Sequence, residues 1–541
     1  MERQIHILAA DALAEEGLEF IREQPDTVLA HKPGLSAAEL SAIIGDYDGL
    51  IVRSGVQITS EVLASSGKLR AIVRAGVGVD NIDVDAATAK GIVVMNSAEA
   101  STTSTAEHAF ALMLALTRHI GHAYVNFRGG GWDRSQFSGN QLSGKTLGVI
   151  GFGRIGQAVA ARAIAFEMNV LAYDPFINAP TMLDGRVKMC KGFTALLPHA
   201  DILTFHVPLN DQTRNMLSAE TLEHCRQGVM VVNASRGGVV NESDLLAALD
   251  SGVCGGLAID VFETEPPPAD HPMRDHPRVL VTPHLGASTR EAQEAVSVAA
   301  AKSLLAFLRD EGLSGAVNIA GFRVDLDPIQ CGFVDLARRM AQLIGPMITA
   351  GIGEITIELQ GDDLTAAATT IERHTLVALL SGHIEADINV INVRQAAERR
   401  GIGLRTMTLD DEKNDWRQLS ITVQSCGTER ERRIVGRIYD DNRPRIVEIN
   451  GYHMDMIPSG AMVMIQNDDR PGMIGLVGTT FGAANVNIAD MAISRRGDTA
   501  LMVLKIDDEP DDATLQLLRD QCGILKVAKI VLAPLLEPSS G

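Results

Sequence analysis

A short apolar strand that ends in a glycine-rich turn limits the folds open to this chain more than any other stretch. Residues 146–150 are mostly apolar, and Gly151-Phe152-Gly153-Arg154-Ile155-Gly156 follows directly, ahead of a helical segment. Strand, GxGxxG turn and helix in this order form the dinucleotide-binding fingerprint. Gly151 permits the tight turn, Gly153 lets a pyrophosphate approach the backbone, and Gly156 lets the helix pack closely on its strand. Free N–H groups at the helix N-terminus favour the phosphates.

An acidic residue at the end of the next apolar run indicates which dinucleotide binds. Residues 170–173 lead into Asp174, about 20 residues beyond the first glycine, where a carboxylate accepts hydrogen bonds from ribose hydroxyls. The charge of Asp174 repels a 2′-phosphate, and residues 175–178 contain no arginine to neutralise one. The sequence therefore predicts NAD, rather than NADP, as the cofactor.

Length, charge and cysteine usage exclude several classes of protein. A chain of 541 residues predicts roughly three or four domains. Lysine and arginine number 48 against 68 acidic residues, and the net charge of −20 argues against nucleic acid or a membrane surface as a partner. No apolar run reaches transmembrane length and no signal peptide is evident, so we expect a cytoplasmic protein. The cysteines are scattered singly, which predicts neither a metal site nor a disulfide framework.

Two arginines follow strands of a predicted parallel sheet in the N-terminal part. The apolar runs that we interpret as its strands are 5–9, 50–52, 69–73 and 92–95. Arg53 and Arg74 stand at carboxyl ends of these strands, where open α/β sheets bind ligands. The loop after Arg74, which includes Gly76, is rich in glycine, so its N–H groups suit an anion. We expect an anion site there, with ordinary surface charge as the alternative.

Three further strand ends carry reactive side chains on the side where the cofactor is expected. The fingerprint opens a second sheet whose later strands we place at 202–205, 229–233, 256–259 and 279–282. Arg236, Glu265 and His284 follow the last three of these strands. Parallel strands bring their carboxyl ends to one edge, so these side chains form an acid–base and anion-binding set.

Two long helices and the C-terminal pattern define the domain order. A helix over 106–120 links the first sheet to the second, and another from Glu291 runs back, which makes the first domain discontinuous. A separate unit follows, with strands at 354–359, 419–423, 433–438 and 444–449, a helix at 365–380 and a solvated loop at 408–416. Residues 461–532 show the order β-α-β-β-α-β, typical of a ferredoxin-like domain.

Taken together, the motifs resemble those of the D-isomer-specific 2-hydroxyacid dehydrogenases over essentially the whole chain. They are the fingerprint and the segments 74–83, 233–238, 260–266 and 283–289. The unit after the second sheet is similar to the intervening domain of the family's long form. Asp469–Gly475 and Asn485–Ile488 are similar to an ACT regulatory domain. The resemblance implies NAD-dependent oxidation of 3-phosphoglycerate to 3-phosphohydroxypyruvate, the first step of L-serine biosynthesis.

The fold class follows from the pattern and the resemblance together. We predict an α/β chain with two doubly wound parallel-sheet domains, then an α+β intervening domain and a ferredoxin-like ACT domain. The predicted boundaries are 1–98 with 285–318 for the substrate domain, 99–284 for the Rossmann NAD domain, 319–455 for the intervening domain and 456–541 for the ACT domain.

The resemblance also implies a role for each site residue. His284 is the base, Glu265 orients it, and Arg236 binds the substrate carboxylate; Arg53, Arg74 and Gly76 hold other anionic groups, and Arg134 reaches a neighbouring subunit's site. The implied cofactor contacts are Gly151, Gly153, Arg154, Ile155, Gly156, Asp174, His206, Pro208, Ala234, Asp260, His284 and Gly286. In the ACT domain, Asn467, Asp469 and Asn487 are the candidates for binding L-serine as an effector. A homodimer or homotetramer is expected.

Three alternatives stay open on the sequence. One is a sister dehydrogenase, such as a hydroxypyruvate or glyoxylate reductase, although the long C-terminal half argues against it. Another is a non-catalytic NAD sensor like the corepressors that share this fold. The third concerns the ACT domain alone, which on pattern could be an inert dimerisation module.

Overall fold

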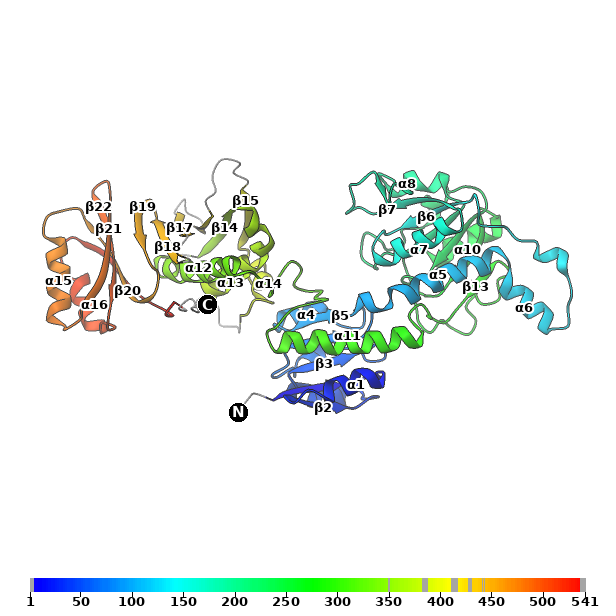
Figure 1. Cartoon of the computed structure of the whole chain (residues 1–541), viewed down its shortest axis with the longest axis horizontal. Coiled ribbons are helices and arrows are strands. Elements are labelled where there is room, and N and C mark those ends of the chain that lie inside the picture. The colour runs from blue at the N-terminus through cyan, green and yellow to red at the C-terminus, as the bar shows by residue number, and fades with distance from the viewer. Residues whose placement is uncertain are drawn as a thin grey trace.

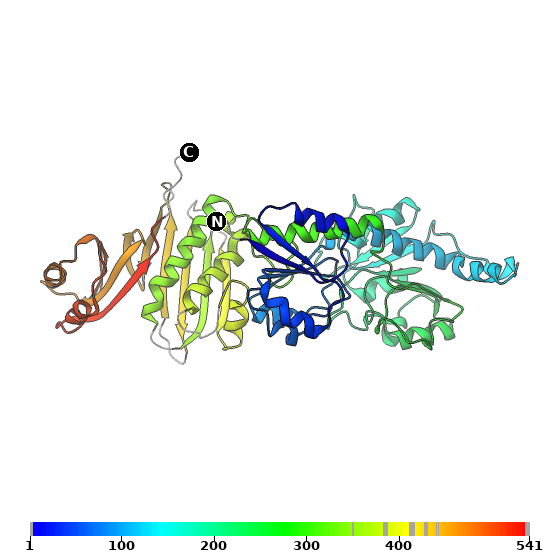
Figure 2. The ribbon, with the colours of Figure 1, turned by 90° about the horizontal axis from the view of Figure 1, so that it is seen from below.

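The described residues form four β-sheets that lie along the long axis of the molecule, with the first sheet of the chain between the second and the third (Figure 1; Figure 2). The structure is a computed structural model that describes residues 4–348, 351–381, 388–409, 417–426, 431–439, 441 and 443–535. Most of the loop predicted at 408–416 lies outside the described residues. Within the described part of the chain, no helix has the length and apolar character needed to cross a membrane.

The first sheet is parallel throughout, as predicted, with the strand order β2-β1-β3-β4-β5. Its strands are β1 (Ile5–Ala9), β2 (Thr27–His31), β3 (Gly49–Val52), β4 (Ala71–Arg74) and β5 (Val93–Asn96). Its helices are α1 (Glu15–Arg22), α2 (Ala37–Ile43), α3 (Ser60–Leu63) and α4 (Val84–Ala89). The order reverses between β1 and β3, and ligands of such sheets bind outside the carboxyl ends at that point.

The second sheet has the order β13-β12-β11-β10-β6-β7-β9-β8, and only β8 runs antiparallel. Its strands are β6 (Thr146–Ile150), β7 (Asn169–Tyr173), β8 (Thr181–Met182), β9 (Val187–Met189), β10 (Ile202–Phe205), β11 (Val229–Asn233), β12 (Cys254–Ile259) and β13 (Val279–Val281). Its helices are α7 (Arg154–Ala165), α8 (Phe193–Leu196), α9 (Ala219–Leu222) and α10 (Glu242–Ser251). The order reverses between β6 and β10, directly beside the glycine turn.

Two helices join the first two sheets. The first, α5 (Thr102–Thr117), runs from one sheet to the other, and α11 (Arg290–Leu308) returns to pack on α1 and β4 (Figure 1). The chain thus leaves the first sheet through α5 and returns to it through α11. Ile319 and Phe322, which follow the boundary predicted at 318, also pack into the core of the first sheet.

The helix predicted over 106–120 differs at both ends from the observed one. The observed helix, α5, begins four residues earlier, at Thr102, and ends at Thr117. The Thr117 carbonyl accepts a hydrogen bond from the Asn140 N–H at 2.9 Å instead of one from the next turn of the helix. His119 then takes a left-handed conformation with φ 53°, and a separate helix, α6 (Ile120–Arg128), starts after it.

The third sheet is mixed, with the order β15-β14-β16-β17-β18-β19. Its strands are β14 (Ile352–Gln360), β15 (Gly403–Leu409), β16 (Gln418–Ser425), β17 (Glu431–Ile438), β18 (Pro444–Ile449) and β19 (Tyr452–Met456). The helices α12 (Pro328–Ile344) and α13 (Ala368–Leu380) pack against each other and contribute to one core with the sheet, and α14 (Val393–Glu398) packs on α13.

The fourth sheet confirms the ferredoxin-like pattern, with the antiparallel order β21-β22-β20-β23. Its elements are β20 (Gly460–Asp468), α15 (Met473–Ala483), β21 (Ile488–Arg496), β22 (Thr499–Ile506), α16 (Asp512–Arg519) and β23 (Ile524–Leu532). Val463 and Ile465 of the central strand form a buried core with Val477 and Leu515 of the two helices.

Replacing Gly156 by alanine is expected to destabilise the second sheet, because a Cβ there would clash with the carbonyl oxygen of Gly151. Overpacking of this kind costs about 1–3 kcal/mol. A Cβ at Gly153 meets no atom within 4 Å, so Gly153→Ala is a matched control for stability. Urea unfolding measures both variants, and equal unfolding midpoints would contradict the packing role of Gly156.

Candidate active site

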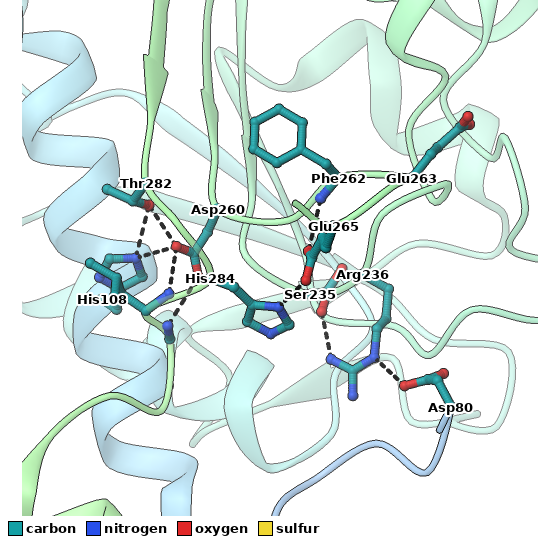
Figure 3. Close-up of polar contacts among 12 residues, drawn as sticks. Asp80, His108, Ser235, Arg236, Asp260, Phe262, Glu263, Glu265, Thr282 and His284 are labelled. Carbon is teal, nitrogen blue, oxygen red and sulfur yellow. Dashed lines mark hydrogen bonds and ion pairs between the residues drawn. The ribbon is translucent and has the colours of Figure 1, made fainter. Parts of the chain in front are cut away.

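The carboxyl ends of the first two sheets meet at one junction. Arg236, which follows β11, places its Nε 3.0 Å from Oδ2 of Asp80 in the loop after β4 (Figure 3). A Cβ at Gly78 would clash with the Arg236 guanidinium, so the glycine loop allows this close approach. Residues from both sheets therefore face the same space, where ligands of α/β sheets bind.

The glycine turn beside β6 fits a dinucleotide. Gly151 has φ 86°, and a Cβ there would lie 2.6 Å from the His206 carbonyl oxygen, so the left-handed glycine is required. Gly153 caps α7, whose first residues are Arg154 and Ile155, and space beside Gly153 is open. Because the first N–H groups of a helix lack internal acceptors, the start of α7 suits the pyrophosphate of NAD.

Asp174 lies against the same turn. Its Oδ2 accepts the Phe152 N–H at 2.9 Å and its Oδ1 accepts the Phe176 N–H at 3.0 Å. These bonds hold the carboxylate next to the fingerprint, and each oxygen keeps a lone pair for a ribose hydroxyl. The position matches the predicted preference for NAD.

His206 and Pro208 follow β10 on the other side of the turn. Burial lowers the pKa of His206 to about 4, so its imidazole is neutral at neutral pH. Its Nε2 lies 3.0 Å from Thr204 Oγ1. A neutral ring adds no charge beside the glycine turn.

His284 and Glu265 form a hydrogen-bonded pair across two loops. Nδ1 of His284 lies 2.7 Å from Oε2 of Glu265, and Oε1 of Glu265 accepts the Phe262 N–H at 3.0 Å (Figure 3). Burial raises the pKa of Glu265, but the hydrogen bonds from His284 and Phe262 outweigh it and hold the pKa below its usual value. An ionised Glu265 fixes the proton on Nδ1, which leaves Nε2 free to accept one.

The turn that carries His284 is held by Asp260. His284 has φ 54°, a conformation that costs a non-glycine residue about 1–3 kcal/mol. Asp260 is 1% exposed, and its carboxylate accepts the N–H groups of Leu285 at 2.8 Å and Gly286 at 3.0 Å. Burial raises the pKa of Asp260, but hydrogen bonds from His108, Thr282 and Leu285 lower it further than burial raises it. Asp260 is thus ionised at neutral pH.

Three arginines concentrate positive charge at the junction. Burial, together with the charges of Arg236 and Arg53, lowers the pKa of Arg74 to about 10, against the opposing effect of Asp80 and Asp11. The Nε of Arg74 is buried without a hydrogen-bond partner among the described residues. An anion placed here would relieve the repulsion between the guanidinium groups and supply the missing acceptor.

The remaining candidates fall into two groups. Ala234 follows β11 and is buried beside the junction, and Gly76 packs next to the Arg74 guanidinium. Arg134 is exposed in a short turn after α6, which projects outward from the second sheet (Figure 1). The structure therefore does not bring Arg134 into contact with the set around His284 in its own chain.

The three effector candidates lie at two ends of the fourth sheet. Asn467 is 2% exposed and its Oδ1 has no hydrogen-bond partner in the described part of the chain. Asp469 lies near it and pairs with Arg495 at 3.3 Å. Because β20 and β21 run parallel, Asn487 at the start of β21 lies at the opposite end, where it donates to Asp507 at 2.6 Å.

Sequence reasoning missed two residues of the site. Asp80 pairs with Arg236, and His108 on α5 lies 3.1 Å from Asp260. Asp80 ends the glycine loop, and His108 is a polar residue within a largely apolar helix, which are the local signals available in the sequence. Neither signal specifies the partner, because both contacts join segments far apart in the chain.

Comparison with known protein families assigns three parts of the chain. Residues 110–286 match the NAD-binding domain of the D-isomer specific 2-hydroxyacid dehydrogenases. Residues 331–450 match the D-3-phosphoglycerate dehydrogenase intervening domain, and residues 461–523 match the ACT domain.

Relatives extend the similarity to nearly the full length. The chain is 36% identical over 530 residues to a D-3-phosphoglycerate dehydrogenase of Archaeoglobus fulgidus, covering 97% of this chain and 100% of that protein. A D-3-phosphoglycerate dehydrogenase of Methanocaldococcus jannaschii is 37% identical over 530 residues, covering 98% and 100%. An NAD-dependent formate dehydrogenase from Staphylococcus aureus, solved with NAD, is 30% identical with a TM-score of 0.52 and covers 58% of this chain and 99% of its own.

Removing the His284 side chain is expected to raise the pKa of Glu265, because the hydrogen bond that opposes burial is lost. Carbon-13 NMR of labelled glutamate carboxyls follows the titration in His284→Ala, with Glu265→Gln identifying the resonance. An unchanged or lower pKa would contradict the pairing. His276→Ala, which removes a loop histidine that lies 3.5 Å from Asp250 of α10, is the control.

Proposed function

The chain belongs to the D-3-phosphoglycerate dehydrogenases of the D-isomer-specific 2-hydroxyacid dehydrogenase family, and on that premise we propose which residues carry its reaction. The reaction is the NAD-dependent oxidation of 3-phospho-D-glycerate to 3-phosphohydroxypyruvate, the first step of L-serine biosynthesis. The observation that carries the proposal is the His284–Glu265 pair beside three arginines.

His284 is the proposed general base. Its Nε2 takes the proton of the C2 hydroxyl, while Glu265, 2.7 Å from Nδ1, stabilises the imidazolium that forms. A bound NAD would supply the acceptor for the hydride from C2. Gly151, Gly153 and the start of α7 would hold its pyrophosphate, Asp174 would hold its adenosine ribose, and Asp260 would orient its nicotinamide carboxamide.

The arginines are proposed to divide the two anionic groups of the substrate. Arg236 comes from the NAD-binding sheet and its planar guanidinium suits the carboxylate next to the reacting carbon. Arg53 and Arg74 come from the first sheet and, with the N–H groups around Gly76, hold the remaining charge. Since the set spans two sheets, substrate binding favours their approach and excludes water from the site.

The reductase and the NAD-sensor alternatives have less support. A glyoxylate reductase from Paecilomyes thermophila covers 59% of this chain, whereas the matches to the intervening and ACT domains lie in the C-terminal part, at residues 331–450 and 461–523. A binding-only protein needs no base held by a carboxylate. The domain boundaries at 98, 284 and 455 are part of this proposal, and the boundary predicted at 318 is moved beyond Phe322, which packs with the first sheet.

We propose that the enzyme is a homo-oligomer in which a second copy covers α6. Five large apolar side chains on α6 and in the segment just after it are more than half exposed: Ile120, Tyr124, Val125, Phe127 and Trp132. An apolar patch of this kind on a projecting segment marks a protein–protein contact. A homodimer or homotetramer assembled through it would carry Arg134 toward the neighbouring subunit.

We propose L-serine as the ligand of the ACT domain. The buried Asn467 has an acceptor without a partner, Asp469 offers a carboxylate for an α-ammonium group, and the turn before α15 presents N–H groups to a carboxylate. Asn487 is separated from Asn467 and Asp469 by about the length of β21, about 30 Å at most. It therefore completes this site only if it comes from a second copy of the chain.

Arg74→Ala is expected to raise the KM for 3-phosphoglycerate at least about tenfold more than the KM for an unphosphorylated D-2-hydroxy acid, as loss of a charged contact implies. Steady-state assays with NAD measure both constants, and Arg70→Ala, an arginine of the same strand region outside the junction, is the control. Wild-type enzyme that fails to oxidise 3-phosphoglycerate would overturn the function. Equal effects on both substrates would remove Arg74 from phosphate binding.

Serine binding is tested by calorimetry on the full chain, alongside inhibition of turnover. Heat with wild type and none with Asp469→Ala is the expected result, because the carboxylate is the proposed partner of the ammonium group. No heat at millimolar serine would leave the domain an assembly module. A response retained by Asp469→Ala would place the site elsewhere.

A further inference from the structure

We propose that His108 is a positioning residue for the reaction: it holds Asp260, and through Asp260 the turn that presents His284. The inference rests on the proposed function of His284 as base. Residues of α5 are absent from the catalytic set predicted from the sequence, yet His108 points from this helix into the group around Asp260 (Figure 3).

The contacts of His108 converge on two acceptors. Its Nε2 lies 3.1 Å from Oδ1 of Asp260 and 3.3 Å from Oγ1 of Thr282. Thr282 donates its own hydroxyl hydrogen to Asp260 at 2.6 Å, so it can accept from His108 but not also donate to it. The proton of His108 therefore sits on Nε2 and points to the carboxylate.

Asp260 transmits this contact to the base. One carboxylate oxygen accepts the N–H of Leu285 and the other accepts the N–H of Gly286, the two residues after His284. The His284 N–H is itself bound to the Asp260 carbonyl at 2.8 Å. A buried carboxylate that loses one donor binds its other partners in altered geometry, and the left-handed turn at His284 depends on those partners.

A second contact ties the same helix to the same loop. Ser104, one turn before His108 on α5, lies with its Oγ 2.7 Å from Oγ1 of Thr289. Helix α5 enters the second sheet directly from the first, so it links the turn of His284 to the segment that joins the two domains. The His108 side chain is 19% exposed, and its Nε2 is engaged with Asp260 and Thr282.

The test compares variants that keep or remove the donor at the position of Nε2. His108→Leu removes the donor and keeps an apolar side chain of similar size. His108→Gln keeps an amide nitrogen near the position of Nε2, whereas His108→Asn is too short to reach Asp260. His276→Leu is the matched control, because His276, in the loop before β13, lies 3.5 Å from Asp250 of α10 and, within the described part of the chain, makes no hydrogen bond or ion pair with Asp260.

Two measurements are made on each variant. Steady-state oxidation of 3-phosphoglycerate gives kcat and KM, and hydrogen exchange of residues 282–289 in the enzyme without NAD gives the stability of the turn. His108→Leu is expected to lower kcat about tenfold or more, the size expected for a lost hydrogen bond to a charged group, with KM little changed. It also speeds exchange of the Leu285 and Gly286 amides, while His108→Gln and His276→Leu stay near wild type.

Equal kcat in His108→Leu and wild type, or equal loss in the leucine and glutamine variants, overturns the proposal. If His108→Leu does not fold, the comparison of His108→Gln with His108→Asn decides it: an active glutamine and an impaired asparagine variant support the proposal, and equal activity overturns it. A wild-type enzyme without activity on 3-phosphoglycerate is a failure of the proposed function instead, and is separate from these outcomes.

Discussion

The hydrogen bond between His284 and Glu265 joins two loops that leave neighbouring strands, and the structure around it keeps both ends in place. The pair needs an ionised Glu265, which the hydrogen bonds from His284 and Phe262 secure against burial. It also needs His284 in a left-handed conformation, which the carboxylate of Asp260 secures through the next two backbone N–H groups. A charged group that is 1% exposed is costly unless it is well bonded, and the N–H groups of this turn supply two of the hydrogen bonds that satisfy Asp260.

Opposite charge patterns meet at the junction of the first two sheets. The NAD-binding side offers ionised carboxylates at Asp260 and Glu265. Arg53 and Arg74 of the first sheet, together with Arg236 of the second, form a cluster of guanidinium groups that repel one another. A substrate with two anionic groups neutralises the guanidinium groups of these arginines. The ionised Glu265 stabilises the positive charge that His284 gains. The protein as a whole carries a net charge of −20, so the local cluster of arginines runs against its overall field.

Local signals made much of the fold predictable. The fingerprint, the later strand ends and the β-α-β-β-α-β order follow from periodicity and turn residues, and the structure has them. The edge strand β2 was missed because it is only partly buried and shows no clear alternation. Helix α12 was missed although its capping box at Asp327 and its apolar spacing were present in the sequence. The end of α5 at Thr117 depends on Asn140, and the low pKa of Arg74 depends on three other loops, so neither has a local signal.

Steady-state oxidation of 3-phosphoglycerate by His284→Asn, with NAD affinity measured on the same sample by fluorescence titration, tests the central claim most directly. The account predicts that kcat falls about a hundredfold or more, as loss of a positioned base does, while the dissociation constant of NAD changes little. Near-normal turnover in this variant would contradict the assignment of His284 as the base and, with it, the role given to Glu265.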